Sequence, residues 1–222
     1  GLSATVFEEI GATNGKKYLA IRGTNSLGND LMADGLLATA IPPNLNPQFI
    51  ALRMQLDTWL SDPNVLQGQN FIVTGHSLGG YLAAAVKQSY SQVTDAYLYN
   101  APGVSGPLGN LVDALSSVLG LSSSSTDNIW NIRGSEGFPI IAGLGYQLGT
   151  AISIQTEASG NNHSISLLTD ALAIQALYSQ LAPNLSQDQL NKLIDAFGST
   201  KDVVGASNSK TLESALDALR TI

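Results

Sequence analysis

The chain has 222 residues, which is long enough for one α/β domain with a full buried core. Hydrophobic residues make up 44% of it and charged residues 12%, a composition too apolar for a disordered protein. The formal net charge of −7 argues against nucleic acid as a partner, because phosphate binding needs clustered Lys and Arg and only ten are present. Without cysteine, the chain has no disulfide, no thiolate metal site and no cysteine nucleophile.

Short apolar runs bounded by glycine or polar residues predict buried strands. These runs are residues 17–21, 70–74, 96–99, 129–132 and 152–155. Within residues 47–60, four apolar side chains fall at spacings that share one face of a helix. Because strands alternate with helices, the pattern predicts an α/β fold with a mostly parallel central sheet flanked by helices.

In the last third of the chain, the sequence pattern predicts mainly helices, over residues 164–181, 186–197 and 210–222. Ser186 is the expected cap of the second of these. The polar segments 122–125 and 157–162 are expected to be loops within a domain, since periodic structure resumes on both sides. We therefore expect a single domain over residues 1–222, with a helical extension from about residue 186.

Several kinds of site and segment find no support in the sequence. No run of about 18 apolar residues occurs, so no transmembrane segment is predicted. The first residues lack the basic start and apolar run of a signal peptide. Two histidines and scattered carboxylates predict no metal and no cofactor, although carboxylates and carbonyls could still bind calcium without an EF-hand pattern.

Residues 75–80, Gly-His-Ser-Leu-Gly-Gly, contain the pattern G-x-S-x-G between an apolar strand and a run of helix formers. That context is typical of a nucleophile elbow, in which the serine lies on a sharp strand-to-helix turn. Gly75 and Gly79 avoid collisions with the neighbouring strand and helix. The turn predicts Ser77 as a nucleophile, with the backbone N–H of Leu78 facing the charge that develops on the substrate oxygen.

A serine hydroxyl needs a base, and histidine is the usual one because its pKa lies near the working pH. His76 is inside the elbow, where the backbone direction points its side chain away from Ser77, and we expect it to be a packing residue. His163 follows the predicted last strand, in a loop of Gly, Asn and Ser. By elimination, His163 is the predicted base.

The third catalytic group should be a carboxylate that orients the imidazole and stabilises its charged form. In the chain order Ser, Asp or Glu, His, it lies between the other two. Glu136 follows the predicted strand 129–132 and is the favoured candidate. Asp127 precedes that strand and so lies at its wrong end, and Glu157 is close to His163 in sequence, but both stay open as alternatives.

A second N–H donor for the oxyanion usually comes from the loop after an early strand. The segment Arg22-Gly23-Thr24 follows the predicted strand 17–21 and fits this position. The backbone amide of Thr24 is therefore the candidate donor, alongside that of Leu78.

Three segments in this order resemble the class 3 lipase family, the fungal-type and bacterial triacylglycerol lipases of α/β-hydrolase fold. The likeness covers roughly residues 16–165. Residues 22–24 look like the family's oxyanion segment, and residues 73–80 are close to its most typical elbow. Residues 99–106 are similar to the segment in which Pro and Gly follow the strand after the elbow. The family usually has Asp where this chain offers Glu136.

The resemblance implies an α/β-hydrolase fold and a secreted, extracellular enzyme that cleaves carboxylic esters through an acyl-enzyme on Ser77. Its expected substrates are lipids, with transient contact at a lipid interface. Phospholipase A1 and short-chain carboxylesterase activities are alternatives within this chemistry, and a non-catalytic lipid- or partner-binding domain is an alternative of another class. The resemblance also suggests a lid in the apolar residues 27–41, for which a short buried helix is an equal alternative.

Overall fold

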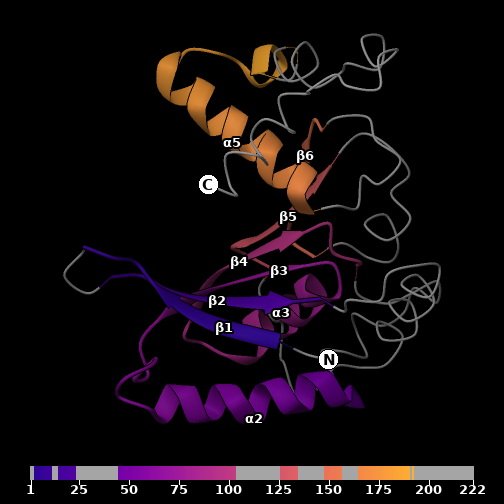
Figure 1. Ribbon diagram of the computed structural model, residues 1–222. Helices are drawn as coiled ribbons and strands as arrows, with labels where there is room; N and C mark the ends of the chain where they lie inside the picture. Colours follow the sequence, from indigo (N-terminus) through magenta and orange to yellow (C-terminus); the bar gives the residue numbers. More distant parts are fainter. Residues whose placement is uncertain are drawn as a thin grey trace, which may run out of the picture. The chain divides into compact units, whose positions relative to one another are not determined.

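The computed structural model describes residues 3–11, 15–23, 45–103, 126–134, 148–156, 165–190 and 192. The described strands are β1 (Ser3–Glu8), β2 (Lys17–Arg22), β3 (Phe71–His76), β4 (Val93–Tyr99), β5 (Ile129–Gly134) and β6 (Thr150–Ile154) (Figure 1). The described helices are α2 (Pro47–Ser61), α3 (Leu78–Ser89) and α5 (Ile165–Leu181). Five strands and three helices therefore lie where the sequence predicts them, and β1 is an addition.

The six strands form one sheet in the order β1-β2-β3-β4-β5-β6. β1 pairs antiparallel with β2, whereas β2, β3, β4 and β5 pair with one another in parallel. The chain therefore has an α/β fold with a mostly parallel sheet, as the sequence predicts. Because β2 to β5 run parallel, their carboxyl ends meet at one edge of the sheet.

The described residues group into two compact units. The first contains those up to Ile132 together with residues 148–152, and the second contains Arg133, Gly134 and the described residues from Ser153 onward. The expectation of one α/β-hydrolase domain over residues 1–222 stays a prediction. In the described part of the chain, no helix combines the length and the apolar character needed to cross a membrane.

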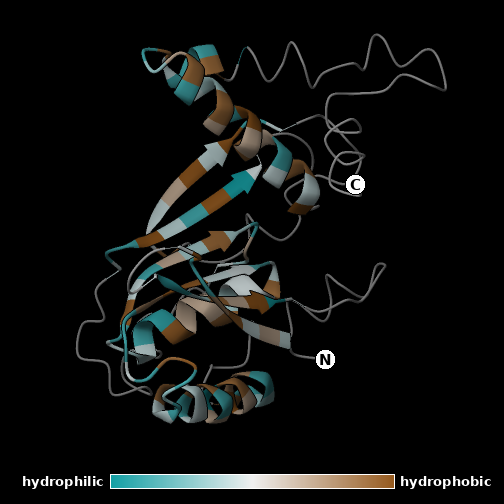
Figure 2. Ribbon diagram, turned by 60° about the vertical axis from the view of Figure 1, so that its left-hand side comes forward, coloured by the Kyte–Doolittle hydropathy of each residue, from teal (hydrophilic) through white to brown (hydrophobic). Residues whose placement is uncertain are grey.

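The first unit is built around α3, which packs against β2, β3 and β4. Every residue from Leu78 to Val86 is buried, and small residues at 79, 80 and 83–85 let this helix lie close to the strands. On β3, Phe71, Val73 and Gly75 are buried while the alternate residues are half-buried, as expected for a strand with one covered face. Figure 2 shows the mainly apolar character of α3 beneath these strands. The prediction that helices cover the sheet is thus confirmed for the face on which α3 lies.

α2 begins and ends at residues suited to those positions. The side chain of its cap, Asn46, accepts hydrogen bonds from the backbone N–H groups of Gln48 and Phe49, at 2.9 and 3.4 Å. Pro47 occupies the first turn, where its missing N–H costs nothing. The helix ends before Pro63, which disfavours helical backbone in the residue preceding it. Phe49, Leu52 and Leu56 are buried, so α2 joins the core through one face.

The described start of the C-terminal extension confirms the predicted cap. The Oγ atom of Ser186 accepts from the N–H of Gln189 at 3.3 Å, and the side chain of Gln189 accepts from the N–H of Ser186 at 2.9 Å. This reciprocal pair is a capping box, and residues 187–190 after it are helical. The rest of the predicted helix 186–197, apart from residue 192, and all of 210–222 lie outside the described residues.

The packing of the buried face of α2 can be tested by two substitutions on this helix, one buried and one exposed. Leu56→Ala should lower the free energy of unfolding by about 2–5 kcal/mol, because Leu56 is fully buried and the substitution leaves a cavity. Met54→Ala should change it by less than about 0.5 kcal/mol, since that side chain is 69% exposed. Urea unfolding followed by circular dichroism measures both. Equal midpoints for the two variants would contradict the packing of α2.

Candidate active site

Ser77 lies on the turn between β3 and α3 in a strained backbone conformation. Its φ of 56° and ψ of −129° fall in a region that residues with a side chain rarely adopt. The backbone on both sides fixes the turn, because the Ser77 N–H donates to the carbonyl of Tyr99 at 2.9 Å and the Ser77 carbonyl accepts from Gly80 N–H at 2.9 Å. The residue is 6% exposed. This is the local geometry that the nucleophile elbow predicts.

Two glycines allow the turn to form, as the sequence predicts. A Cβ atom on Gly75 would collide with the backbone of Gly79, and one on Gly79 would collide with the carbonyl of Ile21. A Cβ atom on Gly80 would lie 2.6 Å from the Cβ of Ala101. The first turn of α3 therefore touches the backbone of β2 and β3 directly, and no side chain fits between them.

The same contacts bring the end of β2 to the start of α3. A Cβ atom built on Gly23 would lie 3.4 Å from the backbone nitrogens of both Leu78 and Gly79. The Leu78 N–H is among the first amides of α3, which have no acceptor within the helix and lie at the positive end of its dipole. Thr24 is the next residue after Gly23 and lies outside the described residues. The position of Thr24 relative to Leu78 stays a prediction.

β4 and β5 end beside the same turn. Ser77 bonds to the carbonyl of Tyr99, and the N–H of Asn100 donates to the carbonyl of Ile132 on β5 at 2.9 Å. Asn100 is 3% exposed and has a φ of 44°, so the chain leaves β4 by a second left-handed turn. These bonds place the carboxyl end of β5 next to the strand that holds Ser77 in position. No local pattern predicts this role of Tyr99 and Asn100, because it depends on strand register.

The predicted acid and base lie outside the described residues. Neither Glu136, His163 nor the alternative Glu157 has a described position, so their approach to Ser77 stays a prediction. β5 ends at Gly134, two residues before Glu136. Asp127 is exposed and precedes the first residue of β5, Ile129, which lies opposite Ala96 near the start of β4. Asp127 thus lies at the opposite end of β5 from the end near Ser77, as the sequence predicts.

Two described tyrosines lie near the elbow, on α3 and at the end of β4. Burial raises the pKa of the Tyr81 phenol well above its usual value. Burial, and next the nearby Tyr97, also raise the pKa of Tyr99. Burial thus makes both phenols weaker acids than an exposed tyrosine. His76 belongs to the half-buried face of β3, with Ile72 and Thr74.

The described residues contain no group of three or more His, Cys, Asp or Glu side chains that could hold a metal ion. The predicted lid, residues 27–41, lies outside the described part of the chain. Comparison with family models gives no match for this chain, and comparison with curated proteins gives none either.

The close backbone contacts at the elbow predict a large effect from a single methyl group. Gly79→Ala should destabilise the protein by about 3 kcal/mol or more, because the new Cβ meets the rigid carbonyl of Ile21 and not a flexible side chain. Gly11→Ala is the control, since Gly11 has a φ of 87° but nothing within 4 Å of the added atom. It should cost only about 1 kcal/mol. Thermal unfolding separates the two, and equal losses would contradict the elbow packing.

Proposed function

We propose that this chain is a serine hydrolase of α/β-hydrolase fold that cleaves carboxylic esters, with lipids as its substrates, as in class 3 lipases. The observation that carries the proposal is the strained conformation of Ser77 at a strand-to-helix turn. Such strain costs stability and persists mainly where function requires it. A second support is the closeness of Gly23, the residue before Thr24 in the sequence, to the backbone of Leu78: a Cβ built on Gly23 would lie 3.4 Å from the Leu78 nitrogen.

In the proposed mechanism, the Oγ of Ser77 attacks the ester carbonyl carbon while the imidazole of His163 takes the hydroxyl proton. The N–H groups of Leu78 and Thr24 stabilise the negative oxygen of the tetrahedral intermediate. When the C–O bond breaks, His163 returns the proton to the leaving alcohol, and an acyl-enzyme remains on Ser77. Water then attacks the acyl carbon with His163 as base, which releases the acid and restores the hydroxyl. Glu136 orients the imidazole and stabilises its charged form.

The nucleophile can be tested separately from folding. Ser77→Ala should reduce hydrolysis of p-nitrophenyl esters by about a thousandfold or more, because the attacking oxygen is lost. Its unfolding midpoint should stay close to that of the wild type, since both residues carry a Cβ at the strained turn. A fluorophosphonate probe should label the wild type and not the variant, because only an activated serine reacts.

Full hydrolysis by Ser77→Ala would end this proposal. A wild-type chain that neither hydrolyses esters nor reacts with the probe would favour the non-catalytic lipid- or partner-binding alternative. For an active chain, a series of p-nitrophenyl esters of increasing length would separate lipase from short-chain esterase activity. Positional analysis of the products from a phospholipid would identify a phospholipase A1.

The acid can be assigned by removing one carboxylate at a time. Glu136→Gln should lower kcat by about a hundredfold or more, because the amide no longer stabilises the imidazolium ion. Asp127→Asn and Glu157→Gln are matched comparisons and should retain at least roughly half the activity, since the proposal assigns the orienting role to Glu136 and none to these two carboxylates. The ratio of kcat values at saturating ester measures this. A large loss in either control with Glu136→Gln unaffected would move the acid role to that residue.

A further inference from the structure

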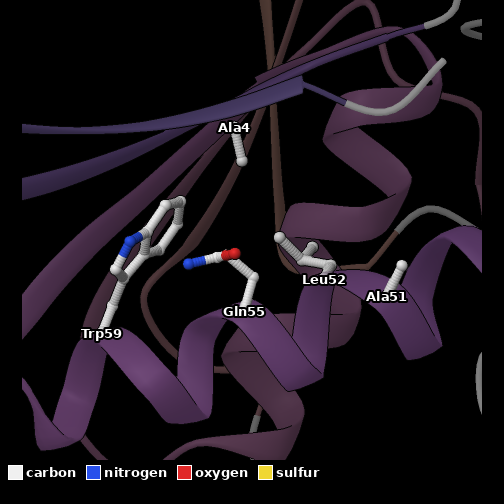
Figure 3. A pocket seen from close by; sticks show the side chains of 5 residues that line it. All are labelled: Ala4, Ala51, Leu52, Gln55 and Trp59. Atoms are coloured by element: carbon white, nitrogen blue, oxygen red, sulfur yellow. The ribbon is translucent and has the colours of Figure 1, made fainter.

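A hollow between β1 and α2 is lined by residues without reactive side chains. It has a volume of about 340 Å³, and the described residues around it are Ala4, Ala51, Leu52, Gln55 and Trp59. Figure 3 shows these five side chains, none of which is an acid, a base or a nucleophile. The described residues that act on the conformation of Ser77 lie instead at the elbow, where β3 and β4 end side by side.

β3 and β4 end in the same way. Just past β3, Ser77 has a φ of 56°, and just past β4, Asn100 has a φ of 44°. The Ser77 N–H donates to the carbonyl of Tyr99, and the Asn100 N–H donates to the carbonyl of Ile132, both at 2.9 Å. Because His76 lies opposite Tyr99 and Tyr99 lies opposite Ile132, each bond closes a parallel ladder at its last pair. The two left-handed residues are thus successive links from β5 to β4 and from β4 to β3.

The start of α3 depends on the backbone around Ser77 and not on its side chain. A serine at the cap of a helix usually accepts a hydrogen bond from an N–H of the first turn, whereas the Ser77 side chain makes no such bond. The Ser77 carbonyl accepts from the Gly80 N–H, and a Cβ atom on Gly80 would lie 2.6 Å from the Cβ of Ala101. The neighbours of Asn100, Tyr99 and Ala101, therefore hold the elbow on both sides of the serine.

The conformation of Asn100 allows both contacts at once. Asn100 and Ala101 are buried, so this segment belongs to the packed interior of the first unit. A left-handed residue turns the chain sharply, and asparagine and glycine adopt this conformation at a lower cost than other residues. An extended conformation at Asn100 would move Ala101 away from Gly80 or draw the Tyr99 carbonyl away from the Ser77 N–H.

We propose that Asn100 is a positioning residue for the nucleophile, because its left-handed backbone sets the two contacts that hold Ser77 in its strained conformation. This inference rests on the proposed hydrolase function, in which the Oγ of Ser77 attacks the ester. The role requires the backbone conformation at position 100 and not the amide group of the side chain. Since a displacement of about 1 Å near the reacting atoms can cost roughly a hundredfold in rate, loss of this conformation should lower kcat. KM should change little, because Asn100 acts on the serine and not on the bound ester.

Substitutions at position 100 separate the backbone conformation from the side chain. Asn100→Gly keeps the left-handed conformation and loses the amide, so its kcat should stay close to that of the wild type. Asn100→Val introduces a β-branched residue that adopts this conformation only with strain, and it should lower kcat about a hundredfold with KM nearly unchanged. Asn100→Ala is a milder variant and should give a kcat between the two. The rate of fluorophosphonate labelling should fall in parallel with kcat, because both depend on the Oγ of Ser77.

Asn128 provides a matched control. It is also a left-handed asparagine beside a strand, with a φ of 58° directly before β5, and its carbonyl accepts from the Ala96 N–H at 2.9 Å. Asn128 lies at the opposite end of β5 from Ile132, whose carbonyl binds Asn100. Asn128→Val should therefore lower the unfolding midpoint through backbone strain and leave kcat unchanged.

Steady-state hydrolysis of p-nitrophenyl esters measures kcat and KM for each variant that circular dichroism shows to be folded. A low kcat for Asn100→Val that glycine restores, with Asn128→Val fully active, would support the proposal. Wild-type kcat in Asn100→Val would overturn it, and wild-type kcat in Asn100→Ala would do so if the valine variant does not fold. A loss in Asn100→Gly as large as in Asn100→Val would also overturn it, because the amide would then be the required group. An inactive wild-type chain would contradict the proposed function as well, whereas an active wild type with an equally active Asn100→Val contradicts this inference alone.

Discussion

The direct contact of backbone with backbone at the start of α3 is the constraint on which the first unit depends. Gly75 on β3 and Gly79 on α3 touch with no side chain between them, and Gly79 also touches the carbonyl of Ile21 on β2. This approach holds the helix against two strands at once, forces Ser77 into its strained conformation and brings the end of β2 beside the helix amides. Because the three consequences share one cause, the geometry of the candidate site is inseparable from the packing of the sheet.

Hydrogen bonds of the surrounding backbone hold Ser77 in its strained conformation. The turn is tied by hydrogen bonds from Ser77 to Tyr99 and from Gly80 to Ser77, and the strand that carries Tyr99 is tied in turn to β5 through Asn100 and Ile132. A buried helix and four paired strands thus hold one residue in an unfavourable conformation. In the proposed mechanism, a serine held in this way beside a helix amide needs little rearrangement when charge develops on the ester.

Local sequence patterns predicted much of this architecture. The apolar runs located β2 to β6, and the spacing of Phe49, Leu52 and Leu56 located α2, because burial on one face leaves a periodic trace. β1 was missed because its small Ala4 gives a weak apolar signal and its Phe7 lies exposed, which breaks the alternation.

For the candidate site, the motif predicted the turn at Ser77 and the neighbouring amide of Leu78. It could not predict that the Tyr99 carbonyl holds Ser77, since that bond depends on the register of strands that are far apart in sequence. The positions of Thr24, Glu136 and His163 relative to the elbow stay predictions. They depend on contacts between residues that are far apart in sequence, which local patterns do not encode.

The central proposal is that Thr24, Glu136 and His163, from distant parts of the sequence, complete a catalytic site with Ser77. A crystal structure of the chain after reaction with an alkyl phosphonate ester would test it most directly, because the phosphonate imitates the tetrahedral intermediate. The account predicts phosphorus bonded to Ser77 Oγ, a phosphonyl oxygen within hydrogen-bonding distance of the Leu78 and Thr24 amides, and the His163 imidazole beside Oγ. A phosphonyl oxygen facing solvent, or His163 remote from Ser77, would contradict it.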